Sequence, residues 1–111
     1  MSDLKKCISI VKDAIEDKKG ESVKILNIAE LSPIADYFVI ASGNNVNQLQ
    51  AIADDIDEKL SKEGIHARQV EGYRSANWIL MDYGDFIVHL FTKDARDFYN
   101  LERVWKDAVT E

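Results

Sequence analysis

The chain has 111 residues, 46% of them hydrophobic and 31% charged; we expect one domain over residues 1–111, and no apolar run is long enough for a membrane helix. Twenty acidic against fourteen basic residues give a net charge of −6, which disfavours direct nucleic-acid binding and favours a basic protein as partner. The single cysteine, Cys7, excludes an internal disulfide, and acidic residues near the N-terminus argue against a targeting segment, so we expect the protein in the cytoplasm.

The first part of the chain predicts one helix and two strands. Apolar residues recur every three to four positions from Asp3 to Lys19, which is typical of an amphipathic helix, and Gly20 is expected to end it. β-Branched residues predict a strand over Val23–Ile28, which the break at Pro33 separates from a second strand, Tyr37–Ala41. The second strand is apolar on both faces, so we expect it at the centre of the sheet.

A second helix and a third strand are predicted in the middle of the chain. Asn44 or Asn45 is expected to cap a helix whose apolar stripe runs from Val46 to Leu60 and which Gly64 ends. Ala67–Val70 follows as a short strand.

The last part predicts a hairpin and a helix. Glu71–Asn77 is a polar loop, and Trp78–Phe91 then forms two apolar strands joined by a tight turn at Gly84. A final helix, capped by Thr92 or Asp94, carries the apolar residues Phe98, Leu101, Val104, Trp105 and Ala108. The predicted order is α-β-β-α-β-β-β-α, an α/β domain with helices packed on a mixed sheet.

The turn at Ser42-Gly43 has a structural and a functional interpretation. A strand, a Ser-Gly turn and a helix N-terminus begin several phosphate-binding sites, but nucleotidyltransferases also need two or three strand-borne carboxylates to hold Mg²⁺. The acids from Asp54 to Glu58 fall within the predicted helix, which leaves Asp82 on a strand and Asp85 in a turn. We therefore favour a helix-capping turn and expect neither a metal nor a cofactor.

The two histidines and the cysteine show no metal-ligand spacing. His89 lies between Val88 and Leu90 in a predicted strand, which favours a hydrogen-bonded core or interface histidine. Cys7 lies on the apolar stripe of the first helix, where it is expected to act as a small hydrophobic residue.

Five residues of the hairpin and the final helix form the best candidate for a binding surface: Trp78, Met81, Asp82, Tyr83 and Tyr99. Aromatic residues beside a carboxylate suit the docking of a basic protein. The alternative is that Trp78 and Met81 belong to the core. The pair Asp36-Tyr37, at the start of the second predicted strand, is a candidate for surface recognition, with an ordinary strand-edge role as the favoured alternative.

The sequence resembles the ribosomal silencing factor family, also called the Iojap family. The matching segments are Ala35–Gly43 (ADYFVIASG), Gln48, Glu71–Tyr73 (EGY), Trp78–Phe91 (WILMDYGDFIVHLF) and Arg96–Trp105 (RDFYNLERVW). Asn44-Asn45-Val46 departs from the small hydroxyl residues that the family more often has after the glycine, which further weakens a phosphate site.

The resemblance implies a nucleotidyltransferase-like fold without catalysis. It implies binding to the large ribosomal subunit through the ribosomal protein uL fourteen, which sterically blocks subunit joining and lowers translation. By the same resemblance, the expected contact residues are Trp78, Met81, Asp82, Tyr83 and Tyr99, with Trp78 as the anchor and Asp82 as the partner of an arginine or lysine. Asp36 and Arg96 are weaker candidates from the resemblance, with a structural role as the alternative.

Three alternatives remain at this point. The first is a factor for large-subunit assembly, the role that the resemblance associates with organelle members of the family. The second is a nucleotidyltransferase. The third is a homodimer, in which the hairpin pairs edge to edge or patch to patch with a second copy.

Overall fold

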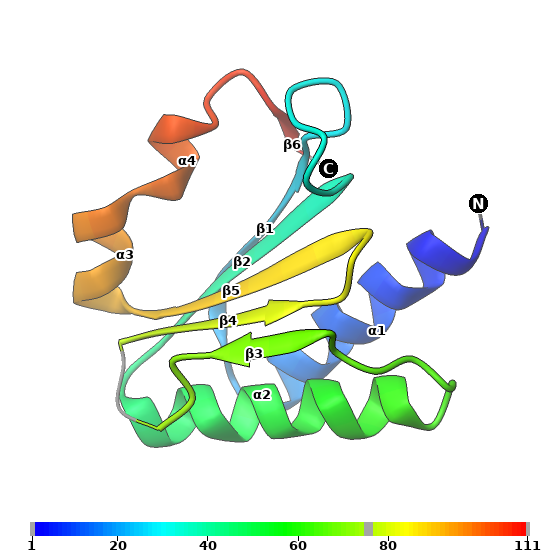
Figure 1. The fold of residues 1–111 in the computed structure, drawn as a ribbon. Coiled ribbons are helices and arrows are strands. Elements are labelled where there is room, and N and C mark those ends of the chain that lie inside the picture. The colour runs from blue at the N-terminus through cyan, green and yellow to red at the C-terminus, as the bar shows by residue number, and fades with distance from the viewer. Residues whose placement is uncertain (1, 75–76, 111) are drawn as a thin grey trace.

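In the computed structural model, which describes residues 2–74 and 77–110, helices pack on both faces of one mixed sheet (Figure 1). The helices are α1 (Ser2–Asp17), α2 (Val46–Ser61), α3 (Lys93–Tyr99) and α4 (Leu101–Val104). The strands are β1 (Glu21–Asn27), β2 (Tyr37–Gly43), β3 (Gln69–Glu71), β4 (Trp78–Asp82), β5 (Phe86–Thr92) and β6 (Val109–Thr110).

The six strands lie in the order β3-β4-β5-β2-β1-β6. β2 and β5 pair in parallel, while the other neighbouring strands are antiparallel. The predicted α/β class, mixed sheet and central position of Tyr37–Ala41 are confirmed, because β2 lies between β5 and β1 and is buried on both faces.

The two faces of the sheet are covered unequally. α1 and α2 bury one face with a core that includes Val39 and Ile79. On the other face, α3 and the C-terminal segment cover a smaller core around Phe38 and Phe91. We call this second face the open face, because its β4 side chains are only half-buried and the β3 side chains beside them are exposed.

The C-terminal part differs from the sequence prediction. The final helix is broken at Asn100, which has a left-handed backbone (φ 45°, ψ 59°) between α3 and α4, and β6 was not predicted. Phe98 is 81% exposed, so its expected place on an inward apolar stripe is wrong. The third strand starts at Gln69, two residues after the predicted start, and includes Glu71, the first residue of the predicted polar loop. Ser75 and Ala76 of that loop lie outside the described residues.

The hairpin of β4 and β5 lies inside the sheet. β3 pairs with β4, and β2 pairs with β5, so both outer sides of the hairpin are already hydrogen-bonded. β3 covers β4 over Leu80–Asp82, so within the described residues the hairpin offers no full-length edge to a second copy, which argues against the edge-to-edge version of the predicted homodimer.

Two glycines illustrate how the turns form. Gly84 has φ +87°, as the predicted tight turn requires. After α1, the left-handed residue is Lys19 (φ 63°) and not Gly20, which corrects the predicted helix end. Gly20 is needed for space, because a Cβ there would lie 2.4 Å from Cγ2 of Ile15.

Within the described part of the chain, none of the helices has both the length and the apolar character needed to cross a membrane.

Candidate partner-binding surface

β4 separates its side chains between the two faces because neighbouring residues of a strand point in opposite directions. Ile79 and Met81 are buried against α1 and α2. Trp78, Leu80 and Asp82 alternate with them and are half-buried on the open face. The open face therefore presents an indole, an aliphatic group and a carboxylate in a row along one strand.

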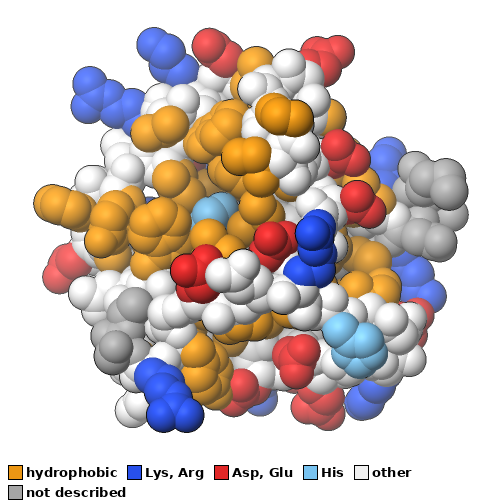
Figure 2. Space-filling view, in the orientation of Figure 1, with side chains coloured by type: hydrophobic (Ala, Val, Ile, Leu, Met, Phe, Trp, Pro, Cys, Tyr) orange, Lys and Arg blue, Asp and Glu red, His pale blue; other side chains and the backbone are white. Residues whose placement is uncertain are grey.

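An aromatic cluster continues this row onto α3. It comprises Trp78, Phe91, Phe98 and Tyr99. The Trp78 ring centroid lies 5.0 Å from that of Phe91 and 4.8 Å from that of Tyr99. Phe98 meets Tyr99 edge to face at 5.1 Å. Figure 2 shows hydrophobic side chains gathered over α3 and the adjoining strands, with acidic side chains beside them.

Two members of the aromatic cluster are strongly exposed: Phe98 at 81% and Tyr99 at 45% of their surface. Aromatic side chains that are held by neighbours but open to solvent on one side are the typical anchors of protein interfaces. Exposed aromatic groups supported from below therefore make this the best candidate surface among the described residues.

His89 lies beneath Trp78. The indole Nε1–H of Trp78 donates a hydrogen bond of 3.1 Å to Nδ1 of His89, which is only 4% exposed. Burial lowers the pKa of His89 to about 4, because the apolar surroundings disfavour the charged imidazolium. The imidazole is therefore neutral at pH 7. The predicted hydrogen-bonded core or interface histidine is confirmed.

Asp82 has two roles, one in the β4–β5 turn and one on the open face. Its Oδ1 accepts a hydrogen bond of 2.8 Å from the backbone N–H of Gly84, which helps to close the β4–β5 turn. The side chain is half-buried, so the carboxylate is accessible to a cation from solvent. One group thus stabilises the hairpin and places a negative charge beside the apolar row.

The structure does not bring all five predicted site residues together. Met81 is 2% exposed and Tyr83 is 8% exposed, and both belong to the core under α1 and α2. The prediction of one exposed patch is wrong for these two residues, since strand alternation points Met81 away from Trp78 and Asp82. Burial raises the pKa of the Tyr83 phenol well above its usual range.

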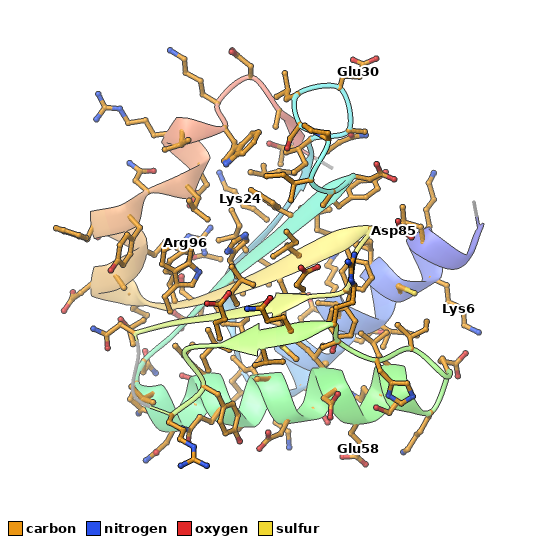
Figure 3. All side chains as sticks on the ribbon, in the orientation of Figure 1. Lys6, Lys24, Glu30, Glu58, Asp85 and Arg96 are labelled. Carbon is orange, nitrogen blue, oxygen red and sulfur yellow. The ribbon has the colours of Figure 1, made fainter. Side chains whose placement is uncertain are left out.

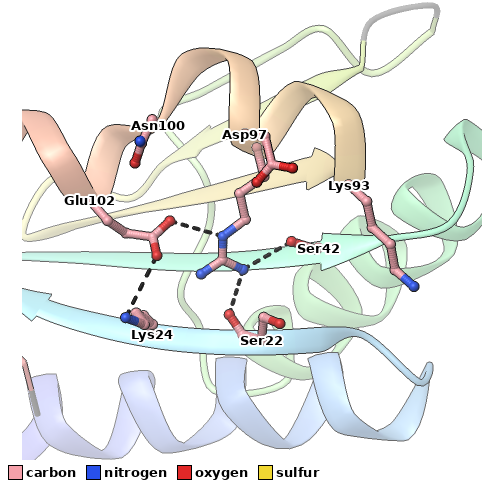
Figure 4. A pocket seen from close by; sticks show the side chains of 8 residues that line it. Ser22, Lys24, Ser42, Lys93, Asp97, Asn100 and Glu102 are labelled. Carbon is pink, nitrogen blue, oxygen red and sulfur yellow. Dashed lines mark hydrogen bonds and ion pairs between the residues drawn. The ribbon is translucent and has the colours of Figure 1, made fainter.

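Arg96 holds α3 in place. Its guanidinium is buried and donates through Nε to Glu102 Oε1 at 2.9 Å and through Nη1 to Ser42 Oγ at 2.9 Å and to the Ser22 backbone carbonyl (Figures 3 and 4). The hydrogen bond from Arg96 lowers the pKa of Glu102. Because these bonds join α3 and α4 to β1 and β2, they fix the platform that carries Phe98 and Tyr99.

These contacts also support the structural interpretation of the Ser42-Gly43 turn. The Ser42 hydroxyl accepts from Arg96, and the Asn45 side chain caps α2 by accepting from the Gln48 backbone N–H at 2.8 Å. Asn45 is thus the N-cap that the sequence left open between two asparagines. Over residues 2–74 and 77–110, the structure gathers no group of three or more His, Cys, Asp or Glu side chains able to hold a metal ion.

The comparison with known proteins decides the family. A family model described as "Ribosomal silencing factor during starvation" matches residues 2–111. The chain belongs to the ribosomal silencing factor family. This confirms the resemblance found in the sequence.

Relatives of this family member match along most of their length. The protein named ribosomal silencing factor RsfS from Halalkalibacterium halodurans is 45% identical over 103 residues, which are 93% of this chain and 88% of the relative. The RsfS of Bacillus subtilis is 42% identical over 104 residues, covering 94% and 88%. A crystal structure of a protein from Chromobacterium violaceum superposes with a TM-score of 0.89 at 29% identity, covering 92% of this chain and 85% of that one.

Sequence reasoning missed two parts of this surface. Leu80 completes the row on β4, and counting alternate residues from Trp78 would have found it. Phe98 had no such signal, because the break at Asn100 turns α3 away from the single long helix that its apolar spacing suggests.

Proposed function

We propose that this protein binds the large ribosomal subunit through the ribosomal protein uL fourteen, and that the bound protein sterically blocks subunit joining and so represses translation. Membership of the ribosomal silencing factor family supports the silencing role. The observation that carries the contact is the row of Trp78, Leu80 and Asp82 beside the exposed rings of α3.

The proposed contact assigns distinct roles to the predicted residues. Trp78 is the anchor that becomes desolvated, Tyr99 extends the aromatic surface, and Asp82 pairs with an arginine or lysine of the basic ribosomal protein. Met81 and Tyr83 lie in the core on the other face of the sheet and take no direct part in the proposed contact, since both are buried. The net charge of −6 suits a basic protein partner and disfavours direct contact with nucleic acid.

We further propose that the protein acts in the cytoplasm by occupying a surface and without catalysis. Homologues named ribosomal silencing factors support a regulatory role. The Ser42 hydroxyl, which a nucleotidyltransferase would turn toward phosphate, is engaged by Arg96.

Sucrose-gradient sedimentation of purified ribosomal subunits with and without the protein tests this function, at two salt concentrations. The protein is expected to travel with the large subunit and to lower the joined-ribosome peak. Trp78→Ala and Asp82→Lys are expected to weaken co-sedimentation, the former by about thirtyfold or more, since truncating an interface anchor typically costs 2 kcal/mol or more.

Two control variants keep this test specific. Ile34→Ala removes an exposed aliphatic group, 64% accessible, on the loop before β2, and Glu58→Lys reverses an exposed charge on α2. Neither residue belongs to the row of Trp78, Leu80 and Asp82 or to the aromatic cluster. Ile34→Ala should therefore sediment like the wild type, and Glu58→Lys should differ from it only through the net charge, most at the lower salt concentration. If Trp78→Ala and Asp82→Lys also behave like the wild type, the site assignment is wrong.

Two other outcomes would point to different functions. Binding to the large subunit without a lower joined-ribosome peak would favour an assembly factor over a silencing factor. Absence from the large-subunit fraction even at low salt would contradict the proposed function and make Mg²⁺–nucleotide calorimetry the next measurement.

We also propose a patch-to-patch homodimer in the free protein, because the exposed rings of Phe98 and Tyr99 offer apolar area to a second copy. Light scattering across a dilution series measures the mass directly. A mass that rises toward twice the monomer on concentration, and that Phe98→Ser lowers, is expected. A monomer mass at every concentration would exclude this dimer.

A further inference from the structure

The hydrogen bond between Trp78 and His89 fixes the chemistry of the imidazole. Because the indole Nε1–H can only donate, His89 Nδ1 must be the unprotonated acceptor at 3.1 Å. The neutral imidazole then carries its proton on Nε2. The hydrogen bond therefore requires His89 to be neutral and to be in the Nε2–H tautomer.

The surroundings of His89 do not otherwise need a polar side chain. The Phe38 ring packs edge to face on the imidazole with centroids 4.6 Å apart, and the Phe91 ring lies parallel to it at 6.3 Å. Nε2 is buried and has no hydrogen-bond partner among the described residues. A buried unpaired N–H is unfavourable, so an aliphatic residue would fill this position at lower cost.

The polar role that remains for His89 is its contact with Trp78. The indole is only half-buried and packs on Phe91 and Tyr99, and these ring contacts constrain its orientation less directionally than a hydrogen bond does. We propose that His89 is a positioning residue: it holds the Trp78 indole in the orientation used for docking. This inference rests on the proposed function, in which Trp78 is the anchor.

Positioning raises affinity by lowering the entropy lost on docking. A side chain that must be immobilised during association weakens binding, whereas one already held does not. Without the acceptor, the Trp78 N–H is also left unpaired in a half-buried site. We expect about tenfold weaker binding when the acceptor is removed, which corresponds to the loss of one such hydrogen bond.

Two substitutions separate positioning from simple core filling. His89→Leu replaces the imidazole by an apolar side chain of similar bulk and so removes the hydrogen-bond acceptor. His89→Asn is smaller but places its amide oxygen near the position of Nδ1, so it can accept from Trp78. We expect large-subunit binding about tenfold weaker for His89→Leu and within about threefold of the wild type for His89→Asn, whereas a filling role predicts the reverse order.

NMR of the wild-type protein tests the bond itself and does not depend on any variant folding. With ¹⁵N labelling, a scalar coupling across the hydrogen bond between Trp78 Nε1 and His89 Nδ1 is expected, together with the imidazole pattern of the Nε2–H tautomer. Trp78→Phe assigns the indole signal, which must be distinguished from that of Trp105. Absence of the coupling, or the opposite tautomer, would overturn the inference.

The binding experiment distinguishes failure of this inference from failure of the proposed function. If Trp78→Ala abolishes binding while His89→Leu binds like the wild type, Trp78 is the anchor and the positioning role is wrong. If Trp78→Ala itself binds like the wild type, the proposed contact is wrong, and the positioning role with it. Weak binding by His89→Leu with recovery in His89→Asn supports both.

Discussion

His89 makes the stability of the fold depend on pH. Its pKa is about 4 in the folded protein against 6.5 in the unfolded chain, so the unfolded state binds more protons between these values. The free energy of unfolding should therefore fall as the pH drops from about 6.5 to 4, by about 3 kcal/mol from this residue, and change no further below that.

Chemical denaturation of wild type and His89→Asn across this pH range measures that effect. The asparagine cannot titrate, so the difference between the two unfolding free energies should change by about 3 kcal/mol from pH 7 to pH 4. His66→Asn is the matched control at an exposed histidine and should follow the wild type. Parallel profiles for wild type and His89→Asn would show that the buried imidazole does not titrate in this way.

Tyr83 allows a second prediction at the level of a single atom. Its ring stacks on Phe86 with centroids 4.9 Å apart, but its buried hydroxyl has no hydrogen-bond partner among the described residues. Tyr83→Phe should therefore leave the unfolding free energy unchanged or raise it by up to about 1 kcal/mol, without changing binding. Met81→Ala, at a neighbouring core position, should lower it by about 2–5 kcal/mol.

Urea denaturation decides this case. A loss above about 1 kcal/mol in Tyr83→Phe would mean that the hydroxyl has a partner in solution. If a stable Tyr83→Phe variant bound the large subunit more weakly, Tyr83 would have to be part of the contact surface.

The five predicted contact residues show which features of the surface follow from local sequence and which depend on tertiary packing. The alternation of β4 is local, so it already contains the separation of Trp78 and Asp82 from Met81. Which of the two faces stays open depends on where α1, α2 and α3 pack, and that is decided by tertiary contacts far apart in the chain. The sequence thus predicts which residue types form the surface, but not which face of β4 is exposed to a partner.

At the scale of elements, α3 depends on the ion pair beneath it. Arg96 is 8% exposed and bonds to Glu102, Ser42 and Ser22. Arg96→Met should lower the unfolding free energy by about 3 kcal/mol, because it removes three hydrogen bonds of a buried guanidinium, while Glu102 keeps its ion pair with Lys24. Thermal melting measures this loss, and a change below about 0.5 kcal/mol would show that the pair contributes little.

The break at Asn100 is a second property of an element. Asn100 combines a left-handed backbone with a side chain that accepts from the Arg103 N–H at 3.2 Å. Asn100→Ala should lower the unfolding free energy by about 2 kcal/mol through both strain and the lost cap, whereas Asn100→Gly should lower it by only a few tenths. Equal losses in denaturation midpoint would contradict this assignment.

The elements themselves were mostly predictable as far as β5, because periodicity and turn residues determine them locally. The end of the chain was not, for two physical reasons. Asparagine tolerates both helical and left-handed backbones, so the apolar spacing concealed the break at Asn100. β6 has two residues and exists through its pairing with Leu26 and Asn27 of β1, a contact distant in sequence.

For the whole molecule, charge should govern how fast the protein reaches its partner. A net charge of −6 attracts a basic surface over distances that salt screens. Raising the salt from about 0.05 M to about 0.5 M should lower the association rate strongly and change the dissociation rate much less. Stopped-flow mixing of labelled protein with large subunits measures both.

Two charge variants refine this prediction. Glu58→Lys changes the net charge away from the open face and should mainly lower the association rate. Asp82→Asn removes a charge within the proposed contact and should mainly raise the dissociation rate. An association rate that does not respond to salt would contradict electrostatic attraction as the driving force.

The alternation of β4 has a consequence for how this protein can evolve. Substitutions at Trp78, Leu80 or Asp82 alter one face of the strand and leave Ile79 and Met81, which point to the other face, in place. An inserted or deleted residue within the strand instead exchanges the faces, sending aliphatic groups into solvent and the indole into the core. Among related proteins, β4 should therefore tolerate changes in the side chains of its open face, but not the gain or loss of a single residue.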